Sequence, residues 1–535
     1  MKRSFQKIFL VIFLVTLSPG QEWVRRYDGP ASDFDVGLDL AFDQFGNCYV
    51  TGYSTNHSFN YDYATLKYSN SGIERWVRRY NGTGNGYDVA RVIRINHQNQ
   101  IFVAGGSYGF GTNLDFLNIR YDTSGNVIWM RRFDGGANLA DEIFDLTTDN
   151  FGYLYLTGYA TDSNYQHCAL TIKYDTSGTM VWSRRYSGPP TINNVGLKIK
   201  LDNWNNVYVA GYGNDTSGWY DYFVLRYDSS GNRVWVANYN GTANRNDYLK
   251  DLAIDTLGNV YVTGYSEGED SNFDCATVKF DASGNQGWEE RYNGTANQDD
   301  RGYRIVLDQN QNVYVVGFSD GIGTAHDFIT LKYDTAGNER WQRRYNGPGN
   351  GDDVAKALAV DDEGNCYVAG HGYFGPVNTD DYMTIKYDSV GNLVAERNYN
   401  GTSSGYDEPN QLRLDQNRNI FLTGESGGLN TSADFTTIKY QTLGIEENQP
   451  SKIKFEELVL PNTLILKQNQ LSLLLQNFEI TKFGISMFDI AGRQIRSQLI
   501  KAKHGLNLFG LNSGIYFLII EADSLVKIIK LVLID

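Results

Sequence analysis

The sequence predicts an all-β protein: an eight-bladed β-propeller of four-stranded antiparallel blades, closed by its N-terminal strand, followed by a small C-terminal β-sandwich. Three observations predict this fold. Gly (56 residues) and Tyr (38) are abundant and Pro (9) is scarce, which suits short strands joined by tight turns. A tryptophan recurs every 53 residues, and the composition changes after the last repeat. A fixed period of this length is typical of propellers and solenoids.

The first 20 residues predict a secretory signal peptide. Lys2, Arg3 and Lys7 precede an apolar run at residues 8–17, and Ser18-Pro19-Gly20 follows with small residues suited to cleavage after Gly20. The apolar run is about half of the roughly 20 residues that a membrane-spanning helix needs. No later segment has that length and apolarity, so we expect a secreted, extracellular mature chain without a transmembrane span.

The repeat begins at residue 21 and ends at residue 441. Its tryptophans lie 53 residues apart, at Trp23, Trp76, Trp129, Trp182, Trp235, Trp288 and Trp341. The eighth copy arrives one residue late with Ala395 in the Trp position, identified by the Tyr-Asn-Gly at 399–401 that matches 80–82. The chain therefore predicts eight copies of one structural unit.

Each copy contains four short segments with the two-residue alternation of β-strands. Examples are residues 76–80, 247–255, 260–264 and 330–333, all rich in β-branched and aromatic side chains. Asp-x-x-Gly-Asn turns, as at 255–259 and 334–338, join the second strand to the third and the fourth to the next Trp strand. Asp can accept backbone N–H bonds across such a turn, and Gly or Asn tolerates the positive φ that reverses the chain. Each copy is thus predicted to be an antiparallel meander.

The ends of the array favour a closed ring. A Trp strand at residues 23–27 precedes the first set of three strands, and none follows the last set at residues 407–440. If the N-terminal strand completes the last blade, the ring closes and the exposed edge of the last set disappears. A linear solenoid would need polar capping repeats, which are not evident. A seven-bladed or open array is the alternative.

The order of motifs in each copy resembles a known bacterial repeat. An Asp, an apolar alternation, Asp-x-x-Gly-Asn, Tyr-Val-Thr-Gly-Tyr and Asp-Tyr-x-Thr-Leu-Lys-Tyr follow one another at 35–68, and a close variant follows at 353–387. This pattern resembles the SBBP repeats of bacterial β-propellers and covers residues 21–441. The resemblance implies a propeller in an exported bacterial protein and says little about activity.

The chain changes character after residue 441. Residues 442–457 are polar and break the period, which predicts a linker. Residues 458–535 are rich in Leu, Ile and Lys, with strand-like segments at 485–495, 511–520 and 527–534. These segments, in this order at the C-terminus, resemble the sorting domain of type IX secretion substrates. That resemblance implies a small β-sandwich recognised by the secretion machinery, with delivery to the cell surface; an ordinary accessory sandwich is the alternative.

The net charge argues against nucleic acid and membrane partners, and the cysteine positions argue against disulfide bonds. The net charge is −15, which disfavours nucleic acid and anionic membranes as partners. Cys48 and Cys366 stand where other copies have valine, as core residues would. Cys168 and Cys275 lie in non-adjacent copies, so no disulfide is expected.

Two series of aspartates recur at fixed positions. The first, called here the first Asp series, opens the second strand of each copy at Asp35, Asp88, Asp141, Asn194, Asp247, Asp300, Asp353 and Asp407. If that strand is innermost, the series forms a ring at one mouth of the central channel, as a collar for a cation or polar ligand. The alternative is that each carboxylate caps a loop, since seven carboxylates facing one pore would repel each other.

A second Asp series opens the fourth strand of each copy except one, which has Cys168. Its members are Asp62, Asp115, Asp221, Asp274, Asp327, Asp381 and Asp434. Calcium at these loops is a further hypothesis, although the spacing of an EF-hand loop is absent. No other cofactor is expected.

Catalytic motifs are weak. Gly-x-Ser-x-Gly occurs at 105–109, 264–268, 317–321 and 424–428, always at one repeat position, where a strand follows instead of the helix of a hydrolase. The six histidines share no short spacing, so neither a zinc site nor a Ser-His-Asp triad is supported.

The loops between the third and fourth strands, such as 211–220 and 371–380, differ between copies. Variable loops on a rigid scaffold are where binding specificity lies. We expect an exported or surface-displayed, non-enzymatic binding or scaffold protein whose loops contact a glycan or a protein. The first alternative is a secreted polysaccharide hydrolase or lyase, which needs copy-specific acids, bases or metal ligands at one channel mouth. A structural role in an envelope layer is the second.

Overall fold

A computed structural model describes residues 21–188, 193–269, 272–375, 380–403, 405–428 and 431–441, together with five segments of the C-terminal region (463–467, 483–489, 494–500, 514–522 and 525–534). The chain divides into two compact units, Met1–Gly444 and Ile445–Asp535. The predicted signal peptide and linker lie outside the described residues.

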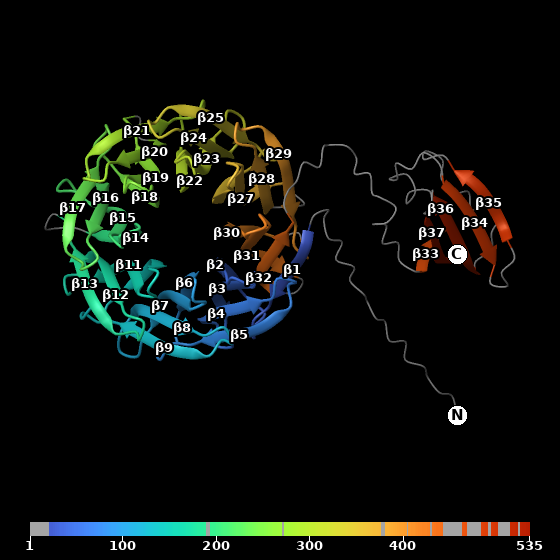
Figure 1. The fold of residues 1–535 in the computed structure, drawn as a ribbon, viewed down its shortest axis with the longest axis horizontal. Helices are drawn as coiled ribbons and strands as arrows, with labels where there is room; N and C mark the ends of the chain where they lie inside the picture. Colours follow the sequence, from blue (N-terminus) through green and yellow to red (C-terminus); the bar gives the residue numbers. More distant parts are fainter. Residues whose placement is uncertain are drawn as a thin grey trace. The chain divides into compact units, whose positions relative to one another are not determined.

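The first unit is a ring of eight four-stranded antiparallel sheets (Figure 1). We number the blades in chain order and give their strands from the central channel outward. Blade 1 holds β2 (Asp35–Phe42), β3 (Cys48–Thr55), β4 (Tyr61–Tyr68) and β5 (Glu74–Tyr80). Blade 2 holds β6 (Asp88–Ile95), β7 (Ile101–Tyr108), β8 (Leu114–Tyr121) and β9 (Val127–Phe133). Blade 3 holds β10 (Glu142–Thr148), β11 (Leu154–Thr161), β12 (His167–Tyr174) and β13 (Met180–Tyr186). Blade 4 holds β14 (Asn194–Leu201), β15 (Val207–Asn214), β16 (Tyr220–Tyr227) and β17 (Arg233–Tyr239).

The second half of the ring repeats this order. Blade 5 holds β18 (Asp247–Ile254), β19 (Val260–Glu267), β20 (Phe273–Phe280) and β21 (Gln286–Tyr292). Blade 6 holds β22 (Asp300–Leu307), β23 (Val313–Asp320), β24 (His326–Tyr333) and β25 (Glu339–Tyr345). Blade 7 holds β26 (Val354–Val360), β27 (Cys366–Tyr373), β28 (Asp380–Tyr387) and β29 (Leu393–Tyr399). Blade 8 holds β30 (Asp407–Leu414), β31 (Ile420–Gly428), β32 (Thr431–Tyr440) and β1 (Gln21–Tyr27).

The ring closes through its N-terminal strand, as predicted. β1 pairs antiparallel with β32, with Tyr27 opposite Phe435 and Val24 opposite Ile438. Blade 8 therefore combines the two ends of the repeat array (Figure 1). This closure pairs the otherwise open edge of β32 and joins the first blade to the last.

The repeated turns form because Asp holds them from its side chain. At the hairpin between β18 and β19, Asp255 Oδ1 accepts hydrogen bonds from the backbone N–H groups of Leu257 (2.9 Å) and Asn259 (2.8 Å). Gly258 takes a φ of 82° there, a conformation that few other residues tolerate. The same arrangement at most of the other hairpins keeps the strands in register.

The tryptophans couple neighbouring blades. Trp76 of blade 1 donates its indole N–H to the carbonyl of Thr123 (3.2 Å), in a turn of blade 2. A Cβ placed on Gly125 of that turn would lie 2.9 Å from the Trp76 ring, so only glycine lets the indole pack there. The hydrophobic clusters likewise combine side chains of adjacent blades, and the period of 53 residues repeats one interblade contact around the ring.

The two ends of the propeller differ in the kind of connection they carry. The Asp-x-x-Gly-Asn turns gather at one end, which we call the turn face. The inner strands start at the other end, beside the loops that join the two middle strands of each blade; we call it the loop face. The inner strands β2, β6, β10, β14, β18, β22, β26 and β30 surround the channel between the two faces (Figure 1).

The described strands of the second unit form one mixed five-stranded sheet. Its order is β33 (Thr463–Lys467), β37 (Leu525–Ile534), β36 (Gly514–Ala522), β34 (Phe483–Asp489) and β35 (Gln494–Ile500). β33 and β37 are parallel and the other pairs antiparallel. The remainder of the predicted sandwich lies outside the described residues. Within the described part of the chain, no helix has the length and apolarity to cross a membrane.

Candidate functional site

The first Asp series lies at the loop-face end of the inner strands, and its side chains are buried. Each residue opens or directly precedes an inner strand, and none is more than 2% exposed. In the carboxylate copies, Oδ2 accepts the backbone N–H of the glycine six residues earlier; in Asp88 this bond is 2.6 Å long, and Oδ1 also accepts the Tyr108 N–H at 2.9 Å. Asn194 instead donates its amide to the Ser187 carbonyl (2.8 Å). Such hydrogen bonds to the loop backbone are the contacts that a loop-capping residue makes. Ligand binding by this series stays a prediction.

Burial raises the pKa values of the carboxyl groups in this series. It raises the pKa of Asp35, Asp141, Asp247, Asp300, Asp353 and Asp407 to about 6, although the hydrogen bonds that these carboxylates accept work in the opposite direction. These loops therefore hold carboxyl groups that titrate close to neutral pH.

Members of the second Asp series contact an arginine of the outer strand in most blades. The ion pairs are Arg26 with Asp434 (2.9 Å), Arg79 with Asp62 (3.0 Å), Arg132 with Asp115 (2.7 Å), Arg291 with Asp274 (2.8 Å) and Arg344 with Asp327 (2.6 Å). In blade 3, Arg185 donates to the Cys168 sulfur (3.3 Å). Blades 4 and 7 have Asn238 and Asn398 at this outer-strand position.

The same arginines explain the Gly-x-Ser-x-Gly motifs. Ser107, Ser266, Ser319 and Ser426 are fully buried, and each hydroxyl accepts a hydrogen bond from the outer-strand arginine of its blade at 2.5 to 2.7 Å. The serines therefore support the arginines and stand in no strained turn. The four cysteines are likewise buried and free.

Within the described residues, one group of acidic side chains has metal-site spacing. The carboxylate oxygens of Asp115, Asp134 and Asp141 lie within 4.8 Å of one another. Arg132 already neutralises Asp115 there, so the group carries a cation of its own.

The central channel holds charged residues that do not follow the 53-residue period. Asp39 of β2 forms ion pairs with Arg94 of β6 and with Arg413 of β30 (3.1 Å), and Arg94 also reaches Asp145 (3.0 Å). Burial alone would raise the pKa of Asp39, but Arg94 and Arg413 outweigh it and hold that pKa well below its ordinary value. The sequence reasoning missed these residues, although Asp39, Asp145 and Asp251 recur every second copy.

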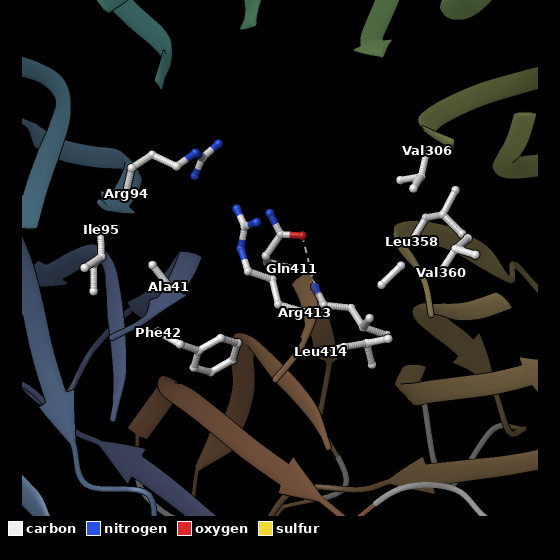
Figure 2. Close-up of a pocket in the computed structure, with 12 residues that line it drawn as sticks. Ala41, Phe42, Arg94, Ile95, Val306, Leu358, Val360, Gln411, Arg413 and Leu414 are labelled. Carbon is white, nitrogen blue, oxygen red and sulfur yellow. Dashed lines mark hydrogen bonds between the residues drawn. The ribbon is translucent and has the colours of Figure 1, made fainter. Parts of the chain in front are cut away.

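Two cavities lie along this part of the channel. One of about 470 Å³ is lined by Ala41, Phe42, Val306, Leu358 and the residues around Arg94 and Arg413; Figure 2 shows both guanidinium groups and the Gln411 amide directed into its open centre. The other, about 310 Å³, is lined by two acidic residues, Asp145 and Asp251, and by five basic ones, Arg94, Lys198, Lys200, Arg304 and Arg413. The channel thus carries a surplus of positive charge within an acidic protein, and such a surplus can bind an anion.

A copy-specific polar cluster lies nearer the loop face, between blades 7 and 8. Lys356 of β26 forms an ion pair with Glu408 of β30, whose other oxygen lies 3.8 Å from His371 Nδ1. Glu408 stands directly opposite Glu425 of β31. Burial raises the pKa of both glutamates and lowers that of His371 to about 3. Comparing the eight copies position by position would have revealed this cluster, because most copies have other side chains at these positions.

An aromatic cluster covers the loop face of blades 4 and 5. Tyr248 of β18 lies 5.3 to 6.0 Å, ring centre to ring centre, from each of four other rings. These rings belong to Tyr212, Tyr220, Tyr265 and Phe273. Arg301 of blade 6 lies over Tyr265 (4.8 Å) and Phe273 (5.1 Å) and extends the cluster with a cation. Apart from Tyr265, these side chains keep partial exposure to solvent.

Comparisons with known proteins agree with the fold and with export. Residues 238–272 match the SBBP β-propeller repeat, and residues 467–534 match the secretion system C-terminal sorting domain. An uncharacterised WD repeat-containing protein, L264, of Acanthamoeba polyphaga mimivirus is 24% identical over 444 residues, which cover 66% of this chain and 30% of that protein.

Solved structures similar to the chain are also propellers. The WD40 domain of SCAP from fission yeast is 9% identical with a TM-score of 0.42, covering 78% of this chain and 98% of that one. The β-propeller domain of the Trilobed protease from Pyrococcus furiosus is 10% identical with a TM-score of 0.38, covering 68% and 94%. The chain thus carries a segment that matches the SBBP β-propeller repeat and a tail that matches the type IX sorting domain, and this tail indicates secretion to the cell surface or the extracellular space.

Proposed function

We propose that this protein is a non-enzymatic, surface-displayed binding protein whose loop face holds a glycan. The aromatic cluster around Tyr248 carries the proposal. Five adjacent, mostly half-exposed rings beside a cation form a platform with apolar faces and polar edges, which matches the alternating C–H and hydroxyl surfaces of a sugar ring.

Exposed aromatic side chains elsewhere on the loop face favour a contact surface broader than this platform. Phe59, Phe110, Tyr165 and Trp219 are exposed in the middle loops of blades 1 to 4. Phe59 and Tyr165 occupy the same repeat position, whereas Phe110 and Trp219 occupy two others, in loops that differ between copies, as expected where a rigid scaffold carries recognition. The sorting domain supports delivery of this surface to the outside of the cell.

Polysaccharide binding by the full chain tests the proposal. Retention of the purified protein on immobilised acidic and neutral polysaccharides, with a glycan array, would be compared with that of Tyr248→Ala and of Phe151→Ala, which removes an exposed ring from a hairpin of the turn face. We expect Tyr248→Ala to weaken binding about tenfold, since stacking on an aromatic ring contributes about 1 kcal/mol or more. If the wild type is not retained, or if Tyr248→Ala is retained equally well, glycan binding at the cluster is contradicted. Capture of a protein partner by the loop face would then indicate a protein ligand in place of a glycan.

A second candidate function, a secreted polysaccharide hydrolase or lyase, is favoured by the cluster of Lys356, His371, Glu408 and Glu425. It brings copy-specific acids and bases together near one channel mouth, and glycosidic bond cleavage uses such paired carboxyl groups. Release of reducing ends or unsaturated sugars from polysaccharides, lost in Glu408→Gln, would establish activity. No release by the wild type under conditions where it binds the polysaccharide would leave the binding function alone.

A further inference from the structure

The eight blades provide internal comparisons for every site they repeat. In blades 1, 2, 5, 6 and 8, a guanidinium from the outer strand neutralises the buried carboxylate of the second Asp series, at 2.6 to 3.0 Å. In blades 1, 2, 5 and 6, this carboxylate interacts electrostatically with a member of the first Asp series in the following blade. Each of these four sites therefore contains two carboxylates and one built-in cation.

Blade 7 keeps the carboxylates and lacks the cation. Asn398 stands opposite Met383 in the β28–β29 pair, the register that Arg344 takes opposite Ile329 in blade 6. The shorter Asn side chain carries no charge. The site thus differs from those of blades 1, 2, 5 and 6 by the loss of one guanidinium.

Asp381 is left without compensation. It is fully buried, and neither of its carboxylate oxygens makes a hydrogen bond of normal geometry. Burial, and next to it the charge of Asp407 in blade 8, raises the pKa of Asp381 to about 7, while the Asn398 amide lowers it. A buried carboxylate with no partner is strongly unfavourable, so a bound cation or a proton would stabilise this site.

Asp407 supplies a second, fixed carboxylate. Its Oδ2 accepts the Gly401 N–H (2.6 Å) and its Oδ1 accepts the Gly427 N–H (2.9 Å), so its position is set by the backbone of blade 8. A carboxylate oxygen has more than one lone pair, and each can still bind a cation while accepting one N–H.

We propose that a Ca²⁺ ion, held by Asp381, Asp407 and the Asn398 amide oxygen between blades 7 and 8, takes the place of the arginine guanidinium of the other blades. Two carboxylates and an amide carbonyl are hard oxygen ligands, which Ca²⁺ prefers, and its flexible coordination suits an irregular site. Secreted modules bind Ca²⁺ at the high concentration outside cells. The ion would connect blade 7 to blade 8, the blade that closes the ring.

Blade 4 shares the Arg-to-Asn change but differs in solvation. Asn238 replaces the arginine, and burial and then the charge of Asp247 raise the pKa of Asp221 to about 7. The Oδ1 atom of Asp221 is also buried without a partner, but the residue as a whole keeps partial contact with solvent, whereas Asp381 is fully buried and neither of its oxygens has a partner. The proposal is therefore confined to blade 7.

Counting bound Ca²⁺ on the full chain tests the proposal. Isothermal titration and equilibrium dialysis with Ca²⁺ up to about 5 mM at pH 7.5 would be applied to the wild type, Asp381→Asn, Asn398→Arg and Gln342→Arg. Gln342 is an exposed outer-strand residue of blade 6, so Gln342→Arg adds the same charge away from the site. We expect Asp381→Asn and Asn398→Arg each to bind one Ca²⁺ fewer per chain, and Gln342→Arg to bind as the wild type does.

Thermal unfolding provides a second readout. Ca²⁺ should raise the Tm of the wild type, and Asn398→Arg should reach a similar Tm without Ca²⁺, because its guanidinium replaces the ion. Wild-type stoichiometry in Asp381→Asn would overturn the proposal even if Asn398→Arg failed to fold. A wild type that binds no Ca²⁺ would also overturn it and would indicate a proton shared between Asp381 and Asp407.

Discussion

Asp39 of blade 1 accepts a hydrogen bond from the backbone N–H of Ile93 in blade 2, at 3.1 Å. The same bond joins Asp145 to Ile199 and Asp251 to Ile305, each at 3.1 Å. These three carboxylates link blades 1 to 2, 3 to 4 and 5 to 6 from within the channel. Blade 7 has Ala357 at this position, and the Leu412 N–H of blade 8 is accepted by Gln411 instead (3.1 Å).

Replacing Asp39 should destabilise the ring. Asp39→Ala removes the acceptor of the Ile93 N–H and leaves Arg94 and Arg413 with one carboxylate fewer, which should lower the free energy of unfolding by about 2 kcal/mol. Urea denaturation measures this change. Glu74→Ala, at an exposed strand position, is the control and should change stability by less than about 0.5 kcal/mol. Equal effects of the two variants would contradict a structural role for Asp39.

The closing strand should depend on Trp23. This side chain is 3% exposed, packs on Tyr68 and Phe421 at ring-centre distances of 5.9 and 5.7 Å, and donates to the Asn70 carbonyl. Trp23→Ala should cost about 3–5 kcal/mol, as expected for a large buried ring. Trp204→Ala, whose ring is 65% exposed, should be nearly neutral in the same denaturation experiment. A small effect at Trp23 would show that the ring stays stable without this closure.

Stability should fall as pH rises through the range set by the first Asp series. Burial raises the pKa of Asp247 from 3.8 to about 6, so the folded state binds its proton more tightly than the unfolded state. The stabilisation is complete below about pH 4 and is lost as pH rises through about 6. Asp247→Asn should remove about 1–3 kcal/mol of this pH dependence, measured by denaturation between pH 4 and pH 7.

Asn194 shows that the amide fits this position, because it donates to the Ser187 carbonyl; the equivalent carbonyl in blade 5 belongs to Asn240. Asp247→Asn should therefore fold. The exposed Glu74→Gln serves as the control and should leave the pH dependence unchanged. An identical pH profile for Asp247→Asn and the wild type would rule out titration of Asp247 in this range.

The sorting domain should be necessary for export. Deleting residues 446–535 removes the segment that matches the secretion system sorting domain and should leave the propeller inside the cell, as measured by cell fractionation and surface labelling. The reciprocal fusion, with residues 442–535 attached to a signal peptide and a reporter, should reach the outside. Surface delivery of the truncated chain would show that another segment carries the export information.

Much of the fold could be predicted from the sequence, because each blade is held by contacts within about one repeat. The hairpin at Asp255 needs only the side chain of Asp255 and the backbone of the next four residues, so eight copies of its motif predict eight copies of its structure. The unmatched Trp23 strand predicted closure for the same reason: a sheet edge must be paired, and one partner was available.

The candidate sites could be predicted less well. The two Asp series were found as repeated positions, but their burial and their arginine partners were not. The clusters around Tyr248 and Glu408 and the channel pair of Asp39 and Arg413 were missed, because their residues do not recur in every copy. Aligning the copies position by position shows which side chains are exceptional, although it does not show which of them meet.

The sequence by itself determined the number of blades, the strands of each blade, the closing strand and the sorting tail. These features follow from local hydrogen bonding and hydrophobic alternation, and both patterns recur in every copy. The tertiary structure alone decided that Asp39 meets Arg413, 374 residues away, and that Asp381 faces Asp407 without an arginine between them. The physical reason is the closure of the ring. It brings residues that are far apart in the sequence into contact across the channel and between blades, and no single repeat contains that geometry.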